Sequence, residues 1–297
     1  MLRIIADSTC DISKEDARKM GIQIVPISVR FGDEEFLDGV EITHEEFYTR
    51  LAECDELPKT SQPSPDTFMK VFNEAVAAGD DVLGIFISSD LSGTYQSACL
   101  AALDVKEETR KKLYMVDSRS ASIGTALLIR EAVKLRDAGV NVSDIAAACT
   151  EMSKYIKLTA VVGSLKYLKM GGRLSGAAAF AGTMLHITPV VSIEDGKVVV
   201  IGKTRGKKAA EKLMHDKLIK DGLSLTRDFM FGHINCSESL ETFINKSLTY
   251  ISDVNGNVGV SSIGCSVGTH VGPGTYGIAY VEAAESGMNR ESIVKTA

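Results

Sequence analysis

The sequence predicts an α/β protein with two domains, an N-terminal domain built on a parallel sheet and a C-terminal domain built on a mixed sheet. In the first half of the chain, short runs rich in β-branched residues alternate with longer stretches of helical spacing, which is typical of a parallel sheet covered by helices. In the second half this alternation ends and a hairpin signal appears. The chain has 297 residues, of which 44% are hydrophobic, so it is long enough for two such cores.

The first domain is expected to occupy residues 1–157. Its predicted strands are Leu2–Ala6, Ile22–Val29, Val82–Ile87 and Leu113–Val116. Its predicted helices are Ser13–Met20, Pro65–Ala78, Thr94–Leu103, Ala121–Ala138 and Val142–Lys154. Strands separated by helices pair in parallel, so the loops that follow them meet at one edge of the sheet.

The second domain is expected over residues 158–297. Its predicted strands are Thr159–Val162, Val190–Ile193, Val198–Ile201, Phe229–Ile234, Val258–Cys265 and Ile278–Val281. Helices are expected over Lys207–Lys220 and from Ser237 onward. Asp195 and Gly196 predict a tight hairpin between two of these strands, so this sheet contains antiparallel pairs.

Charge and cysteine content limit the partners and the compartment. Lys and Arg number 33 against 39 Asp and Glu, a net charge of −6, which argues against a nucleic-acid partner. The six cysteines form no CxxC pair and predict reduced thiols in a cytoplasmic protein. The N-terminus leads directly into a strand pattern, so no export signal is expected. The best candidate for a membrane span, Leu174–Ile193, is built largely of Gly, Ala, Ser and Thr and is too polar to insert.

Several motifs of known sites match the sequence without the context that they need. Residues 264–268 (GCSVG) have the GxSxG pattern of serine hydrolases, but we expect no helix after them, and His270 is too near in sequence to act as the separate base. Residues 272–277 (GPGTYG) match a dinucleotide motif but lead into a strand, and residues 202–204 (GKT) follow a strand instead of a phosphate-binding loop. The five histidines lack metal-ligand spacing, so no metal site is predicted.

Three loops share hydroxyl-bearing residues with glycine or proline. They are residues 59–65 (KTSQPSP), 88–94 (SSDLSGT) and 268–274 (GTHVGPG). The second loop joins a predicted strand to a helix N-terminus, where unpaired backbone N–H groups favour an anion. Ser61 and Ser92 each precede a helix, and either one alone is an ordinary helix cap. Three such loops together predict an anion site.

Seven segments carry a resemblance to a known family. They are residues 7–9 (DST), 60–64 (TSQPS), 91–98 (LSGTYQSA), 116–118 (VDS), 168–173 (LKMGGR), 202–206 (GKTRG) and 270–274 (HVGPG). In this order they resemble the DegV family, the fatty-acid-binding proteins that include the FakB subunits of bacterial fatty acid kinases. The chain after Glu285 matches no part of this pattern.

The resemblance implies a tunnel between the two domains that holds a long-chain fatty acid of the palmitate or oleate class. It assigns Ser61 and Ser92 as the primary contacts of the carboxylate, with Thr60, Thr94 and His270 nearby. It implies a carrier without catalytic residues or a cofactor, which presents the fatty acid to a separate ATP-dependent kinase for acyl-phosphate formation. Arg173 and Arg205 match arginines associated with that step.

Two other function classes stay open on the sequence. An esterase would use Ser266 as its nucleophile, and a regulator that binds a small anion would use the same loops without a tunnel. The Gly- and Ala-rich residues 173–185 fit a tunnel wall and tight helix packing equally well. Basic residues at the start of helix Lys207–Lys220 oppose the helix dipole, which fits a phosphate or acidic partner as well as a solvated face. Contact with a membrane surface is expected to be transient at most.

Overall fold

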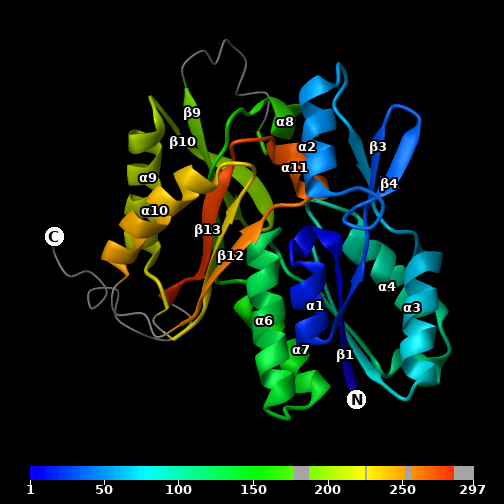
Figure 1. The fold of residues 1–297 in the computed structure, drawn as a ribbon. Helices are drawn as coiled ribbons and strands as arrows, with labels where there is room; N and C mark the ends of the chain where they lie inside the picture. Colours follow the sequence, from blue (N-terminus) through cyan, green and yellow to red (C-terminus); the bar gives the residue numbers. More distant parts are fainter. Residues whose placement is uncertain (177–186, 225, 252–255, 284–297) are drawn as a thin grey trace.

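The first domain contains the predicted parallel sheet. The computed structural model describes residues 1–176, 187–224, 226–251 and 256–283, and Figure 1 shows this sheet between a blue helix on one side and cyan helices on the other. Its strands are β1 (Leu2–Asp7), β2 (Ile22–Val25), β6 (Asp81–Phe86) and β7 (Leu113–Asp117). All neighbours pair in parallel in the order β2-β1-β6-β7.

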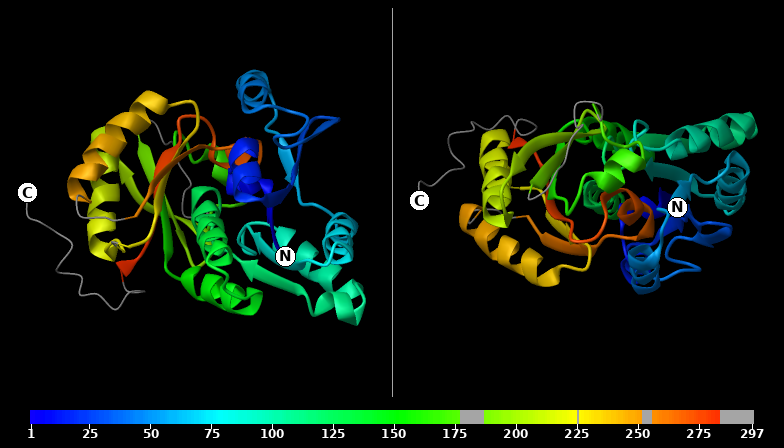
Figure 2. Two further views of the ribbon diagram at one scale, coloured as in Figure 1. Left: turned by 60° about the horizontal axis from the view of Figure 1, so that its bottom comes forward. Right: turned by 90° about the horizontal axis from the view of Figure 1, so that it is seen from above.

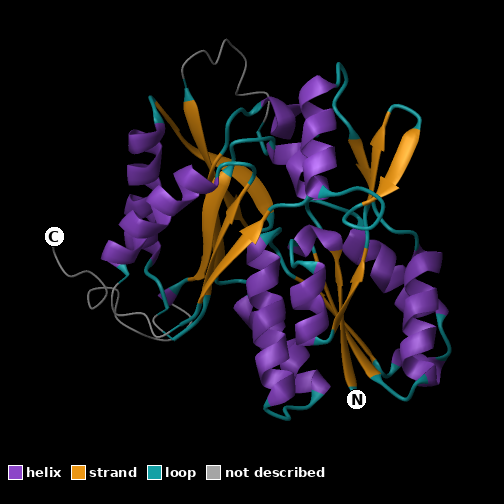
Figure 3. Cartoon of the chain, in the orientation of Figure 1, coloured by secondary structure: helices purple, strands orange, loops and turns teal. Residues whose placement is uncertain are grey.

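Helices cover both faces of this sheet, because its strands bury side chains on both sides. On β1, Ile4 packs toward one set of helices and Ile5 toward the other. The first set is α1 (Lys14–Met20), α6 (Ile123–Asp137) and α7 (Val142–Met152), and the second is α3 (Pro65–Ala77) and α4 (Thr94–Asp104). A 3-10 turn, η1 (Ser8–Cys10), follows β1, and a short helix, α5 (Glu107–Arg110), precedes β7. Figure 3 shows the helices on both sides of the strands.

A small antiparallel sheet, which we did not predict, lies beside the first one. It has the order β4-β3-β5 and consists of β3 (Ser28–Phe31), β4 (Glu34–Leu37) and β5 (Lys59–Ser61), with α2 (His44–Glu53) between β4 and β5. The single strand predicted over Ile22–Val29 is therefore wrong. Pro26 lies between β2 and β3, and because proline has no N–H, the parallel ladder ends there.

The second domain contains a six-stranded mixed sheet, as predicted. Its strands are β8 (Ile156–Val161), β9 (Thr188–Glu194), β10 (Lys197–Thr204), β11 (Phe229–His233), β12 (Val258–Ser262) and β13 (Tyr276–Val281). In the order β10-β9-β8-β13-β11-β12, only β11 and β12 pair in parallel. The helices α9 (Lys207–Asp221) and α10 (Ser237–Tyr250) cover one face. The domain boundary expected after residue 157 falls within β8.

Two short helices lie on the face of the second sheet opposite α9 and α10, and one of them contradicts a prediction. They are α8 (Lys166–Met170) and α11 (Cys265–Val271). We predicted a strand up to Cys265 and a loop beyond it, but β12 ends at Ser262 and a helix begins at Cys265. The prediction was wrong because a distant carboxylate, Asp38, accepts hydrogen bonds from the first backbone N–H groups of α11.

The two domains share a central helix and buried hydrogen bonds. Helix α6 contacts β1 and β6 of the parallel sheet as well as β8, β11 and β13 of the mixed sheet, and Figure 2 shows it between the two bodies. The buried Tyr48 hydroxyl of α2 lies 3.0 Å from the Ile263 carbonyl and 3.2 Å from the Gly264 carbonyl. None of the helices in the described ranges combines the length and the apolar composition of a membrane span.

We expect Tyr48→Phe to lower the free energy of unfolding by about 1–2 kcal/mol, because two buried carbonyls lose their donor. Urea denaturation measures this loss. Tyr114→Phe in β7, at the edge of the parallel sheet, is the matched control and should change the value by less than about 0.5 kcal/mol. Equal losses in the two variants would contradict a role of Tyr48 in joining the domains.

Candidate functional site

A cavity lies where the two domains meet. Its walls come from the carboxyl ends of the parallel strands, from the face of the mixed sheet opposite α9 and α10, and from α11. Its empty space, including open solvent at the mouth, is about 910 Å³. The wall is mainly aliphatic, and β8 and β9 supply Leu158, Ala160, Val191 and Ile193. Its polar residues are Thr9, Thr60, Ser92, Ser122, Arg173, Ser266, His270 and Thr275.

Strand β5 directs Thr60 into the cavity. Because side chains alternate along a strand, Thr60 faces inward while Lys59 and Ser61 are exposed on the other face. The Thr60 hydroxyl lies 2.9 Å from Nε2 of His270, which comes from α11. This hydrogen bond joins the small sheet of the first domain to the second domain.

Ser92 reaches the cavity from the loop between β6 and α4. Its Oγ lies 2.9 Å from the Thr94 hydroxyl and accepts the Thr94 backbone N–H at 3.3 Å. Thr94 is fully buried outside the cavity wall, so its role is to hold Ser92 in place. A Cβ on Gly93 would come within 2.1 Å of Oε1 of Gln62, so the two predicted donor loops pack directly together.

Arg173 connects the end of α8 with the Ser92 loop. Its Nε donates to the Leu91 carbonyl at 3.0 Å, and its Nη1 donates to the Gly171 carbonyl at 2.6 Å. Gly171 in turn lies against His270, since a Cβ there would come within 2.2 Å of the imidazole Nδ1. Glycine at this position therefore allows His270 and Arg173 to lie at the same end of the cavity.

The electrostatics of this end suit an anion. Burial, with a smaller contribution from the Arg173 charge, lowers the pKa of His270 to about 4. The imidazole is therefore neutral at pH 7, and the positive charge in the cavity wall belongs to Arg173. The hydrogen bond between Thr60 and the neutral His270 uses one of the two protons of this pair. The remaining donor of the pair, the Ser92 hydroxyl and one guanidinium can hold a single carboxylate.

The structure brings together only part of the residue set that the sequence predicted. Thr60, Ser92, His270 and Arg173 lie in the cavity wall, and Thr94 supports Ser92. Ser61 is exposed outside the wall, and Arg205 is exposed beyond the end of β10. Part of the segment 173–185 proposed as tunnel lining lies outside the described residues, as does the chain after Glu285.

Sequence analysis did not assign four further hydroxyls to the ligand site, those of Thr9, Ser122, Ser266 and Thr275, although it named Ser266 as the nucleophile of an esterase. Thr9 belongs to the opening DST segment and offered a signal of its position after β1. Ser122 and Ser266 reach the cavity through the helices α6 and α11, whose starts depend on tertiary hydrogen bonds. No pattern in the sequence indicates Ser122, and the GxSxG pattern around Ser266 indicates a nucleophile instead of a cavity wall.

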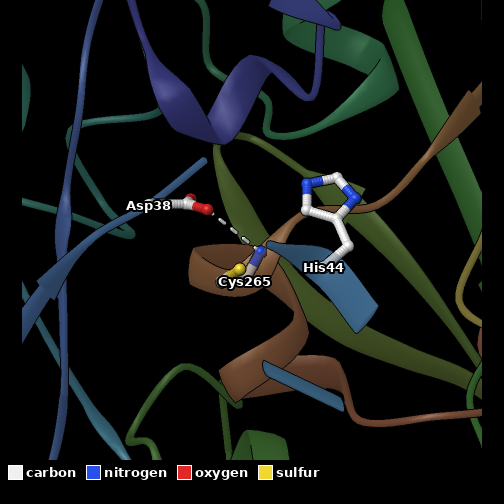
Figure 4. A group of neighbouring side chains, drawn as sticks. All are labelled: Asp38, His44 and Cys265. Atoms are coloured by element: carbon white, nitrogen blue, oxygen red, sulfur yellow. Dashed lines mark hydrogen bonds between the residues drawn. The ribbon is translucent and has the colours of Figure 1, made fainter. Parts of the chain in front are cut away.

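A buried carboxylate outside the cavity wall accepts hydrogen bonds from the backbone of α11. Asp38 accepts the backbone N–H groups of Cys265 at 3.2 Å and Ser266 at 3.1 Å, which caps α11. His44 and Cys265 place further metal-ligand atoms beside it, as Figure 4 shows. Histidine spacing could not indicate this group, because its members come from distant segments. Since both Asp38 oxygens already accept N–H groups, the arrangement serves the helix cap, and we assign no metal to it.

Two more carboxylates of the first domain are buried nearby. Asp7 accepts the Ile87 backbone N–H at 2.9 Å, and Asp11 accepts the Gly264 backbone N–H at 2.8 Å. Burial raises the pKa of both carboxyl groups, in spite of these hydrogen bonds. They fix the strand ends and loops around the cavity.

The structure does not show the hydrogen bond between a serine and a base that the esterase hypothesis requires. A helix does begin within the GxSxG segment, contrary to our expectation, but the Ser266 Oγ makes no hydrogen bond within the described residues. The nearby His270 uses Nε2 for Thr60, and its Nδ1 has no partner there. A serine nucleophile needs a base within hydrogen-bond reach, so this geometry does not support ester hydrolysis.

The family model described as "Uncharacterised protein, DegV family" matches residues 1–283 of the chain. The chain belongs to the DegV family. This confirms the resemblance stated on the seven segments. A DegV domain-containing protein of Clostridium acetobutylicum is 36% identical over 289 residues, which cover 94% of this chain and 97% of the relative.

Solved structures of the family share the two-domain fold. A fatty-acid-binding DegV family protein from Thermus thermophilus is 31% identical with a TM-score of 0.85, over 94% of this chain and 99% of that one. A stearic-acid-binding protein from Eubacterium ventriosum is 30% identical with a TM-score of 0.84, over 96% of this chain and all 100% of that one. DegV, a fatty-acid-binding protein from Bacillus subtilis, is 27% identical with a TM-score of 0.81, over 95% and 99% of the two chains.

The lowered pKa of His270 predicts a loss of stability in acid. Its folded pKa of about 4 lies below the unfolded value of 6.5, so the stabilisation is complete above pH 6.5 and is lost as the pH falls through 4. In His270→Asn, the decrease in unfolding free energy between pH 7 and pH 4 should be smaller by on the order of 2 kcal/mol. Urea denaturation at both pH values measures it. Ser61→Ala, which keeps the imidazole, should show the full decrease, and a full decrease in His270→Asn would refute the assignment.

Proposed function

We propose that this protein binds a long-chain fatty acid in the cavity between its domains and acts as a carrier, without catalysing a reaction itself. The observation that carries the proposal is the division of the cavity wall into a mainly aliphatic part and one end with Thr60, Ser92, His270 and Arg173. That end suits a carboxylate, and the aliphatic remainder suits an acyl chain. Fatty-acid binding by family members about 30% identical to this chain supports the proposal.

The acyl chain supplies most of the affinity. About 14 buried methylenes at ~0.8 kcal/mol each contribute on the order of 11 kcal/mol before the costs of association. The polar end chiefly prevents a penalty, because a carboxylate left unpaired in a desolvated site would cost several kcal/mol. Its donors also fix the direction in which the ligand lies in the cavity.

A finer part of the proposal concerns a partner. We propose that the carrier presents the fatty acid to a separate ATP-dependent kinase that phosphorylates the carboxylate in the cytoplasm, with only transient contact to a membrane surface. Arg173 beside the carboxylate site supports this, since a guanidinium can pair with a transferred phosphoryl group. Arg205, exposed on the surface, is available to a partner protein.

A regulator that binds a small inorganic anion is the second candidate. The same polar end would serve it, but the aliphatic part of the wall would then have no ligand. Binding of palmitate with no measurable competition from inorganic phosphate would separate the two functions in favour of the lipid.

We expect purified protein to retain fatty acid. Solvent extraction followed by mass spectrometry should detect a long-chain acid near one equivalent per chain, and delipidated protein should take up palmitate again. Butyrate, which carries the carboxylate without the chain, is the control and should bind weakly. Failure of delipidated protein to bind any long-chain acid would end the proposal.

The affinity for palmitate should depend on the hydroxyls that line the cavity and not on the neighbouring hydroxyl outside it. Thr60→Val and Ser92→Ala should each raise the Kd for palmitate about five- to hundredfold, because a hydrogen bond to a charged group is worth about 1–3 kcal/mol. Ser61→Ala, on the outer face of β5, is the matched control and should leave the Kd unchanged. Isothermal titration gives these values, and circular dichroism checks the fold. A loss of affinity in Ser61→Ala but not in Thr60→Val would reverse the assignment.

A further inference from the structure

Ser266 offers the cavity a buried hydroxyl that no group in the described residues engages. The residue is part of the cavity wall and is 2% exposed, and its buried Oγ has no hydrogen-bond partner in the described part of the chain. The Ser266 backbone N–H donates to Asp38 at 3.1 Å, which holds the residue in the first turn of α11. A ligand made only of methylenes would leave this hydroxyl unpaired, which is unfavourable in a desolvated site.

The position of Ser266 relates it to the carboxylate end of the ligand. Ser266 and His270 are four residues apart on α11, so they lie on the same face with about 5–6 Å between their Cβ atoms. Both contribute to the cavity wall. Ser266 therefore lies beside the first carbons of an acyl chain whose carboxylate is held at His270, far from the terminal methyl group.

Two acceptor oxygens lie in the same part of the wall. The Thr9 hydroxyl donates its proton to Asp7, and the Ser122 hydroxyl donates its proton to Asp11. Each oxygen thus keeps a lone pair for a donor in the cavity. Ser122 is close to the start of α11, because Asp11 also accepts the Gly264 backbone N–H at 2.8 Å.

A hydroxyl both accepts and donates, so as a substituent on an acyl chain it matches a free donor beside two free acceptors. A keto oxygen would satisfy Ser266 alone, and a methylene would satisfy none of the three residues. We propose that the cavity prefers fatty acids with a hydroxyl close to the carboxyl group, at the 3-position, with Ser266 donating to it and Thr9 or Ser122 accepting from it. This rests on the proposed fatty-acid binding and specifies the substrate class of that site.

The test compares ligands on delipidated full-length protein. Isothermal titration would give the Kd for palmitate, for the two enantiomers of 3-hydroxypalmitate and for 12-hydroxystearate. One 3-hydroxy enantiomer should bind about three- to tenfold more tightly than palmitate, as expected for one added hydrogen bond in a fixed geometry. The other enantiomer and 12-hydroxystearate, whose hydroxyls cannot reach Ser266, should lack this advantage.

Variants assign the preference to its residue. Ser266→Ala should remove the three- to tenfold ratio between 3-hydroxypalmitate and palmitate, and Ser266→Thr, which keeps a hydroxyl, should retain it. Ser92→Ala is the matched control, because it weakens the grip on the carboxylate shared by both ligands and should leave their ratio as in the wild type. Circular dichroism checks that each variant is folded.

Two results would overturn this inference without affecting the proposed fatty-acid binding. One is equal affinity of the wild type for palmitate and both 3-hydroxy enantiomers. The other is a Kd ratio between palmitate and 3-hydroxypalmitate that persists in Ser266→Ala. No binding of any of the four acids would instead overturn the proposed function, and this inference with it. The palmitate measurement on the wild type distinguishes the two failures.

Discussion

Carboxylates of the first domain that cap the backbone of the second hold the whole site together. Asp11 accepts the N–H of Gly264, and Asp38 accepts those of Cys265 and Ser266. A helix leaves its first N–H groups without partners inside the helix, and negative charge is favourable at that end. These hydrogen bonds set where α11 begins and therefore where His270 meets Thr60. The arrangement has a cost, seen in the raised pKa of the buried Asp11.

The cavity uses two kinds of wall for two tasks. Alternating residues of β8 and β9 present Leu158, Ala160, Val191 and Ile193 to the cavity, so affinity scales with apolar area. The polar end is built from loops and helix ends, where backbone and hydroxyl donors are available. Its charge is modest, because the imidazole of His270 is neutral at pH 7 and Arg173 supplies the guanidinium. For the proposed fatty acid, binding strength and ligand orientation would thus be set by different parts of the chain.

Local patterns predicted most of the fold and part of the site. Periodicity and the Asp195-Gly196 turn gave the parallel sheet and the hairpin, because these depend on neighbours in sequence. The small sheet escaped prediction, since its strands are short and Pro26 interrupts the apolar run before it. Composition indicated the Thr60 and Ser92 loops, but which of two adjacent hydroxyls faces the cavity is set by strand alternation on β5. Helix α11 depends on a carboxylate more than two hundred residues away, which no local pattern contains.

The position of the cavity between the domains makes its occupant a structural component. Its aliphatic wall takes residues from both domains, such as Ile87 from the first and Val191 from the second. An unfilled apolar space lacks dispersion contacts on its lining, whereas an acyl chain restores them on both sides at once. The proposed fatty acid would fill this apolar space, and by mass action its binding would favour the folded chain. If the protein carries a fatty acid as proposed, the loaded form should therefore resist unfolding and proteolysis better than the empty one.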